Sequence, residues 1–317
     1  MDGFTLPVGE WVENAVDWLR DNLTALFEII TVVVKWSVEG LTDVLLAVPV
    51  LILIAIFALI GWLLRSWQMA LGTALAFLLV VAMDLWVATM QTLSLVLVAT
   101  IVALIIAIPL GIWSARNDTV RAILKPVLDF MQTMPGFVYL IPAITFFSIG
   151  VVPGVVATVI FALPPGVRLT ELGIRGVDSE TVEAGQAFGA TKGQILRGIQ
   201  LPLAMPTIMA GVNQVIMLAL SMAVLAGIVG ADGLGKIVVQ SVSSARLGIG
   251  VEAGLAVVVI AVYLDRVTAA LGNPADHRSS LLGIMSRRRA ARRGTSDAPA
   301  SASDQAGEEA LQPAGSR

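Results

Sequence analysis

Apolar positions follow one another in this chain over stretches much longer than the buried face of a soluble helix needs. Between residues 44 and 231 the stretches without Asp, Glu, Lys or Arg are 44–64, 66–83, 85–115, 130–167 and 198–231. A helix that crosses a bilayer needs roughly 20 apolar residues, so the two longest stretches exceed one crossing. The pattern predicts a polytopic integral membrane protein, an all-α bundle of membrane helices.

We expect about seven spans. The run that begins at Phe130 is divided in two near Gly150–Pro153, because a Gly-Val-Val-Pro sequence can break a helix. The predicted spans are Val44–Leu64, Ser66–Met83, one within Trp86–Ser114, the two halves of the run from Phe130, about Pro206–Val229 and about Leu247–Leu271.

Residues 1–43 form a distinct segment ahead of the spans. From Glu10 to Glu39, apolar residues recur at three- and four-residue spacing with charges between them, which predicts an amphipathic helix. The tryptophans Trp11, Trp18 and Trp36 suit an outer membrane interface. The alternative is a helix that packs against the protein's own spans.

Charge segregation predicts the orientation. Threading seven spans puts Arg65, a loop at Arg116–Lys125, the loop 168–206 and the C-terminal tail on one side. The opposite side receives the N-terminal segment, which has eight acidic and two basic residues. Basic loops stay in the cytoplasm, so we expect a multi-pass inner-membrane protein with its N-terminus outside. An even number of spans would break this agreement.

Composition adds a division of the chain and two exclusions. We divide the rest into the first two spans (44–85), a transmembrane core (86–272) and a cytoplasmic tail (273–317) that is largely disordered from residue 286. The tail's arginines are expected to lie against anionic lipid headgroups. Cysteine is absent and His277 is the single histidine, so neither disulfides nor a metal site is expected. Nothing resembles a cleavable signal peptide.

The loop 168–206 is the most informative segment. Ser179 can cap a first short helix that Gly189 ends, and Thr191 can cap a second helix, Lys192 to Ile199, that stops before Leu201-Pro202. Two short helices rigidly joined to spans suit the transmission of a push from a soluble partner. The alternative is a packed loop that only connects two spans, although loops of this length usually have a function.

The residues of this loop resemble the EAA motif of ABC importer permeases, E-A-A-x3-G-x9-I-x-L-P. The matching positions are Glu183, Ala184, Gly185, Gly189, Ile199, Leu201 and Pro202. Gly185 replaces the second alanine, which lowers helix propensity slightly and keeps a small side chain. Residues 86–271, and the stretch 200–235 in particular, resemble glycine betaine/proline betaine permeases of the osmoprotectant type.

The resemblance implies a type I importer permease that pairs with a second copy, binds a separate ABC ATPase and receives solute from an extracytoplasmic binding protein. The loop would dock on the ATPase, with Glu183 making a polar contact and Gly189 permitting the turn. The chain has no G-x-x-x-x-G-K-[ST] phosphate loop, so ATP and Mg²⁺ are expected on the ATPase and no cofactor or nucleic acid in this chain. Gly230–Gly235 is interpreted as a tight turn with close helix packing.

For the solute we expect a betaine, whose quaternary ammonium can lie against aromatic rings. Candidate path residues in the sixth span are Asn213, Gln214 and Ser221, with hydrogen bonding between helices as the simpler role. Asn213 and Gln214 point about a hundred degrees apart. Choline, carnitine or an amino acid is the alternative solute.

Two other classes fit less well. A secondary transporter needs ionisable residues within its spans, whereas the charges here are mostly at span ends. An intramembrane enzyme would need a motif such as H-E-x-x-H or G-x-S-x-G, and neither occurs.

Overall fold

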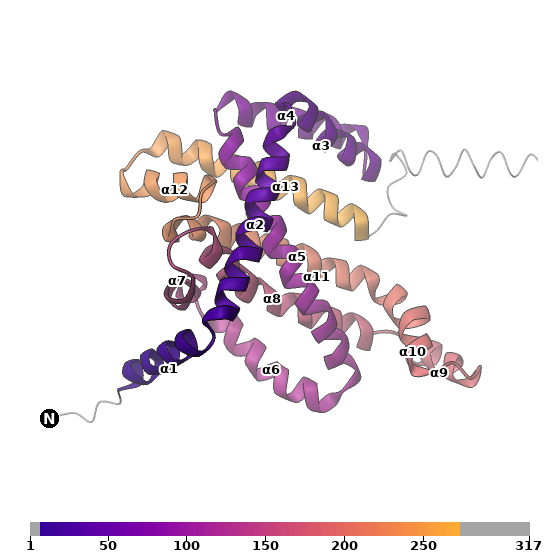
Figure 1. Cartoon of the computed structure of the whole chain (residues 1–317). Helices are drawn as coiled ribbons and strands as arrows, with labels where there is room; N and C mark the ends of the chain where they lie inside the picture. Colours follow the sequence, from indigo (N-terminus) through magenta and orange to yellow (C-terminus); the bar gives the residue numbers. More distant parts are fainter. Residues whose placement is uncertain (1–6, 273–317) are drawn as a thin grey trace, which may run out of the picture.

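The computed structural model describes residues 7–272, and every regular element in that part of the chain is helical. Four long helices form the bundle: α5 (Trp86–Arg116), α8 (Val151–Arg175), α11 (Leu201–Ala226) and α13 (Leu247–Gly272). Shorter helices precede or connect them (Figure 1): α1 (Val8–Asn22), α2 (Thr24–Ala47), α3 (Val50–Leu64), α4 (Trp67–Ala82), α6 (Asp118–Thr133), α7 (Leu140–Phe147), α9 (Ser179–Ala187), α10 (Lys192–Ile195) and α12 (Leu234–Ser243). The predicted tail, His277 included, lies outside the described residues.

Length and composition confirm a membrane bundle. Four helical segments of the described chain are long and apolar enough to cross a bilayer, and two sharply bent helix pairs raise the number to six. The apolar α4, with 16 residues, corresponds to the predicted second span, Ser66–Met83, and would bring the number of spans to seven. The predicted third, sixth and seventh spans correspond to α5, α11 and α13.

The first predicted span, Val44–Leu64, is wrong as a single helix. α2 continues from Thr24 to Ala47, past the expected segment boundary at residue 43, and meets α3 at 105°. The break falls at Val48 and Pro49, both with extended backbone (ψ 131° and 135°). A proline disfavours helical geometry in the residue before it, which is why the helix ends there.

The fourth predicted span is also bent. α6 ends at Thr133 and turns by 106° into the segment Gly136–Phe147, again ahead of a proline, Pro135. The expected Arg116–Lys125 loop is therefore mostly helical, and Asn117 caps α6 by accepting the N–H groups of Thr119 and Val120. The predicted break near Gly150 is confirmed, because α8 begins at Val151 directly after it.

The N-terminal segment forms two helices in place of one. α1 and α2 meet at Leu23, and α2 runs across the bundle to the α3–α4 hairpin (Figure 1). Phe27 stacks on Phe146 with ring centroids 4.6 Å apart, so α2 packs on the spans as the alternative predicted. The apolar side chains of Ile29, Val33 and Trp36 still point outward at helical spacing, which suits contact with lipid.

Candidate functional site

The EAA loop (residues 168–206) begins on α8 and continues into the short helix α9. Asp178 caps α9 by accepting the N–H of Glu180 at 3.0 Å. The predicted cap, Ser179, is instead the first helical residue. Asp178 has the extended backbone of a cap residue, and its carboxylate is at least as good an acceptor as the serine hydroxyl.

Gly189 makes the turn between α9 and α10, as predicted. Its φ is +79°, a left-handed conformation that glycine adopts without strain. The N–H of Gly189 reaches the carbonyl of Gln186 at 2.8 Å, which satisfies one of the last acceptors of α9. Thr191 then starts α10 in a capping box with Gln194, so the predicted second cap is confirmed.

The second short helix does not stop before Leu201-Pro202, contrary to prediction. α10 passes through one π-helical turn, Leu196–Gln200, directly into α11. In that turn the N–H of Leu201 bonds to the carbonyl of Leu196, five residues back. Pro202 has no N–H to donate and sits in the first turn of α11, where a proline is tolerated. The loop is therefore continuous with a long apolar helix.

The loop presents one face outward and one face to the bundle. Glu183 and Ala184 are exposed, whereas Gly185 is half-buried, and a Cβ there would lie 2.7 Å from Ile199 Cδ1. The glycine in place of alanine thus lets Ile199 approach α9. On the inner face Ile195 and Leu196 are buried. Leu196 packs with Ile174 of α8 and Ala204 and Ile208 of α11.

Phe188 is the residue of this loop that sequence reasoning missed. Its side chain is 92% exposed, at the end of α9 and beside the turn at Gly189. Among the described residues it is the most exposed large apolar side chain, which makes it a candidate contact residue of the loop. The signal in the sequence was an aromatic residue directly before the turn glycine of an otherwise polar helix.

α8 and α11 join the EAA loop to the opposite end of the bundle. They pack along their lengths because glycines let their backbones approach. A Cβ on Gly173 would lie 3.2 Å from the Ala204 carbonyl oxygen, and one on Gly211 would lie 2.9 Å from Leu169 Cβ. At the far end a Cβ on Gly154 would lie 2.7 Å from Ala226 Cβ. The two helices are thus closely packed near both ends of the α8–α11 pair.

A polar cluster in the part of the EAA loop that belongs to α8 holds that helix to α5 and α6. Glu171 of α8, only 15% exposed, accepts the Ser114 hydroxyl at 2.7 Å and pairs with Arg121 Nε at 2.8 Å. Arg175 donates to the Ser114 carbonyl at 3.0 Å and to Asp118 at 2.7 Å. A further ion pair joins Arg168 to Asp129. Charge-assisted hydrogen bonds are among the stronger hydrogen bonds in proteins. They therefore hold the C-terminal end of α8 firmly against α5 and α6.

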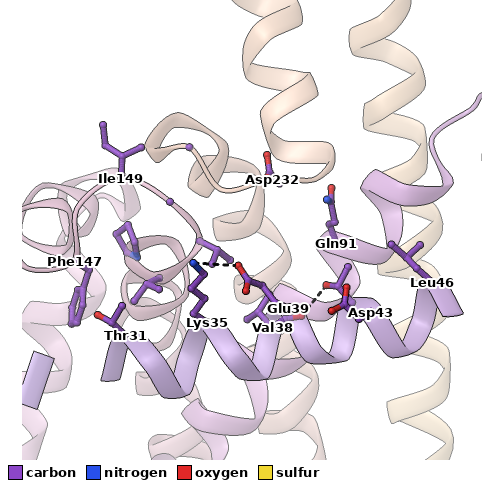
Figure 2. Close-up of a pocket in the computed structure, with 16 residues that line it drawn as sticks. Thr31, Lys35, Val38, Glu39, Asp43, Leu46, Gln91, Phe147, Ile149 and Asp232 are labelled. Atoms are coloured by element: carbon purple, nitrogen blue, oxygen red, sulfur yellow. Dashed lines mark hydrogen bonds and ion pairs between the residues drawn. The ribbon is translucent and has the colours of Figure 1, made fainter. Parts of the chain in front are cut away.

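A cavity of about 530 Å³ lies at the other end of the α8–α11 pair. It is bounded by α2, the start of α5, the residues around Gly150 and the loop at Asp232. Figure 2 shows Lys35, Glu39 and Asp43 on the face of α2 that turns toward Asp232 and Gln91. Lys35 Nζ is 3.8 Å from Glu39 Oε1, so the rim carries both signs of charge with an acidic excess.

The glycine-rich segment 230–235 closes this end by tight packing, as interpreted from the sequence. Gly230 and Gly233 have φ of +84° and +120°. A Cβ on Gly227 would lie 2.4 Å from the Gly235 backbone, so the two glycines allow direct backbone contact. The N–H of Leu234, the first residue of α12, donates to Thr92 Oγ1 of α5 at 2.8 Å.

The three candidate path residues have different surroundings. Asn213 donates to Asp265 Oδ1 at 2.9 Å and accepts from the Thr268 hydroxyl at 3.0 Å, which joins α11 to α13. Gln214 and Ser221 are exposed and seven residues apart, so they share one face of α11. Among the aromatic residues that could face a solute, Tyr263 of α13 is buried, with its ring centroid 5.3 Å from that of Phe57 and 5.6 Å from that of Phe77.

A bundle of membrane helices in which two short helices continue into closely packed spans has the architecture of a transport permease. Residues 107–273 match the family model described as "Binding-protein-dependent transport system inner membrane component", and the chain belongs to that family.

Named relatives agree with this assignment. The chain is 47% identical to the glycine betaine transport system permease protein OpuAB of Bacillus subtilis, over 83% of this chain and 93% of that one. It is 42% identical to the glycine betaine/proline betaine transport system permease protein ProW of Escherichia coli, over 87% and 78%. A solved structure of the MetNI methionine ABC transporter, inward facing, shares the fold: TM-score 0.52, 24% identity, 60% of this chain and 93% of that chain.

Proposed function

We propose that this chain is the permease subunit of an ATP-driven importer for glycine betaine, proline betaine or a related quaternary-ammonium compatible solute. The observation that carries the ATP-driven part is the continuity of the EAA loop with α11 through an unbroken helical path. A displacement of α9 is transmitted to the bundle because Ile195 and Leu196 are buried where the loop packs against the bundle. The relatives support the solute class.

The coupling surface consists of the exposed side of α9. Glu183 offers a polar contact and Phe188 an apolar one to a groove on a separate ABC ATPase, which carries ATP and Mg²⁺. The chain has no phosphate loop with which to bind the nucleotide itself. Gly189 sets the angle between the two short helices, and Ile199, Leu201 and Pro202 join them to α11.

The membrane arrangement follows from the charges. We place the N-terminus outside and the EAA loop in the cytoplasm, according to the excess of basic residues on that side. The cavity bounded by Lys35, Glu39 and Asp232 then faces outward. A solute-binding protein that docks there would meet charged groups. This end of the α8–α11 pair is opposite the EAA loop, where the ATPase binds.

The transport path is placed between two copies of the chain. Gln214 and Ser221 lie on a face of α11 that the described part of this chain leaves uncovered, and a second copy supplies the opposite wall. Asn213 is engaged in bonds to α13, so its role is to join the helices. Solute recognition of high specificity belongs to the binding protein.

Uptake into proteoliposomes tests the function. The chain is reconstituted with its ATPase and binding protein, and radiolabelled glycine betaine uptake is measured with internal ATP or with a non-hydrolysable analogue. Accumulation with ATP alone supports the proposal. Uptake that needs no ATP and disappears with the ion gradient would establish a secondary transporter. Uptake of choline, carnitine or an amino acid, with none of any betaine, would replace the solute class and keep the ATP-driven mechanism.

A further inference from the structure

A second cavity, of about 450 Å³, lies between α4 and α13, away from the EAA loop and from the outer cavity. Much of its wall is apolar, with Met69, Phe77 and Val259 among the lining side chains. Arg65 and Arg266 are its charged residues. An apolar cavity with two guanidinium groups matches a ligand that is hydrophobic along most of its length and anionic at one place.

The two arginines lie at one end of the cavity wall that each helix contributes. Arg65 directly precedes Ser66, the cap of α4, and is the first lining residue of that stretch. Arg266 is the last lining residue of α13 and lies toward its C-terminal end. With the N-terminus of the chain outside, both ends face the cytoplasmic leaflet. The arginines therefore sit at headgroup depth, and the apolar wall extends into the bilayer.

The surroundings of the cavity are suited to hydrocarbon. Leu71 and Leu75 of α4 are exposed beside it, and so are Val258 and Val262 of its wall. Exposed apolar side chains in that density belong to a surface that lipid covers. The cavity is thus suited to acyl chains at its side, while Arg266 at its end is about half-exposed and has its Nε 3.8 Å from Asp265 Oδ2.

We propose that this cavity binds an anionic phospholipid of the cytoplasmic leaflet. One acyl chain lies along Phe77 and Val259, and the phosphate accepts hydrogen bonds from Arg65 and Arg266. Basic pockets between membrane helices on this side are suited to such headgroups. A phosphatidylcholine carries the same phosphate but adds a trimethylammonium next to two guanidinium groups, which repel it. The same repulsion disfavours a betaine in this cavity.

Native mass spectrometry of the full-length chain, purified in detergent, measures the binding. Phosphatidylglycerol and phosphatidylcholine are added in parallel, and inorganic phosphate is a third probe that lacks acyl chains. We expect retained phosphatidylglycerol, weaker phosphatidylcholine and no retained free phosphate. The change Arg65→Gln or Arg266→Gln should weaken phosphatidylglycerol binding about fivefold for each arginine. Arg197→Gln, an exposed arginine of the EAA loop, is the charge-matched control.

A second variant tests the apolar part without touching charge. Gly72 lines the cavity, and a Cβ there would meet no atom within 4 Å, so Gly72→Leu adds side-chain volume at the cavity from an unobstructed attachment point. It should reduce lipid retention several-fold while the unfolding midpoint in lipid-free detergent stays unchanged. Gly254→Leu is the matched control, because Gly254 is equally unobstructed and lies outside the cavity lining.

Three results would overturn the proposal. The first is equal retention of the two phospholipids, and the second is retention that neither the arginine nor the Gly72 change affects. The third is disulfide formation between two copies of the Gly72→Cys variant, which would show that a second copy of the chain covers the cavity. The chain has no native cysteine to confuse that result.

Discussion

Phe188 shows what a single side chain adds to the EAA loop. It is almost fully exposed, whereas the neighbouring Ile195 and Leu196 are buried against the bundle. Burying a phenylalanine side chain stabilises a complex by about 1.5–3 kcal/mol. Because α9 is capped at both ends, the ring is presented from a helix that needs little ordering on binding.

Replacing this ring should weaken docking on the ATPase. Phe188→Ala is expected to cost about 2 kcal/mol of binding free energy, or about thirtyfold in the dissociation constant. Titration of labelled ATPase against the permease in nanodiscs measures it. Phe130→Ala, which removes an exposed ring from α6, is the control. Equal affinity of the Phe188 variant and the native chain would remove Phe188 from the coupling surface.

At the scale of elements, the α8–α11 pair depends on small residues where the helices meet. Gly154 makes a tight contact of this kind at the end of the pair away from the EAA loop, because Ala226 occupies the space that a Cβ on Gly154 would need. Overpacking such a contact costs typically about 1–3 kcal/mol. The pair is therefore sensitive to added volume at a few positions and tolerant elsewhere.

Gly154→Val should lower the thermal unfolding midpoint of the purified chain, because the added atoms force α8 and α11 apart. Gly254→Val in α13 is the matched control, since a Cβ there meets no atom within 4 Å. Valine suits a helix interior about as well at one site as at the other. Equal midpoints for the two variants would show that close packing at Gly154 is unimportant.

The ion-pair cluster at Glu171 holds the same pair at the EAA loop. Glu171→Ala leaves Arg121 and the Ser114 hydroxyl without their shared acceptor and should destabilise the chain by about 1.5–3 kcal/mol. Glu171→Gln keeps an acceptor for the Ser114 hydroxyl and should therefore lose less stability than Glu171→Ala. Unfolding by denaturant compares the two with Glu28→Ala, an exposed residue of α2. A variant as stable as the Glu28 control would mean that the cluster contributes nothing to stability.

The sequence predicts the elements well where one physical signal dominates. Uncharged length located α5 and α11, and the left-handed turn at Gly189 followed from the need for a glycine. Prolines were harder to interpret. The sequence does not say that Pro49 bends a helix while Pro202 fits into one, because the π-helical turn that accommodates Pro202 depends on tertiary packing.

The site was predictable only in part for the same reason. Spacing identified the EAA positions, but the exposure of Phe188 and the partners of Asn213 depend on which face each helix turns to the bundle. The polar cluster joins Glu171 to Ser114, 57 positions away, and a single sequence carries no signal for such a pair. At the start of α9 we expected Ser179 as the cap, whereas the local geometry of the folded chain places Asp178 in that position.

At the scale of the whole molecule, the permease is expected to function as two copies around one path. The absence of native cysteine makes this arrangement easy to probe. Ser221→Cys lies on the uncovered face of α11, so it should form a disulfide or a short bis-thiol cross-link between copies in membranes. Ile105→Cys, exposed on α5, is the control. Cross-linking at position 105 with none at 221 would place the interface elsewhere.

ATP hydrolysis by the reconstituted complex tests the central claim most directly, because it requires the solute, the binding protein and the EAA loop together. With glycine betaine and binding protein present, we predict stimulated hydrolysis by the native complex and loss of most of that stimulation with Glu183→Arg. Glu252→Arg makes the same change at an exposed residue of α13 and should leave the stimulation of ATP hydrolysis intact. No stimulation by any betaine, choline or carnitine, or full stimulation in the Glu183 variant, would contradict the account.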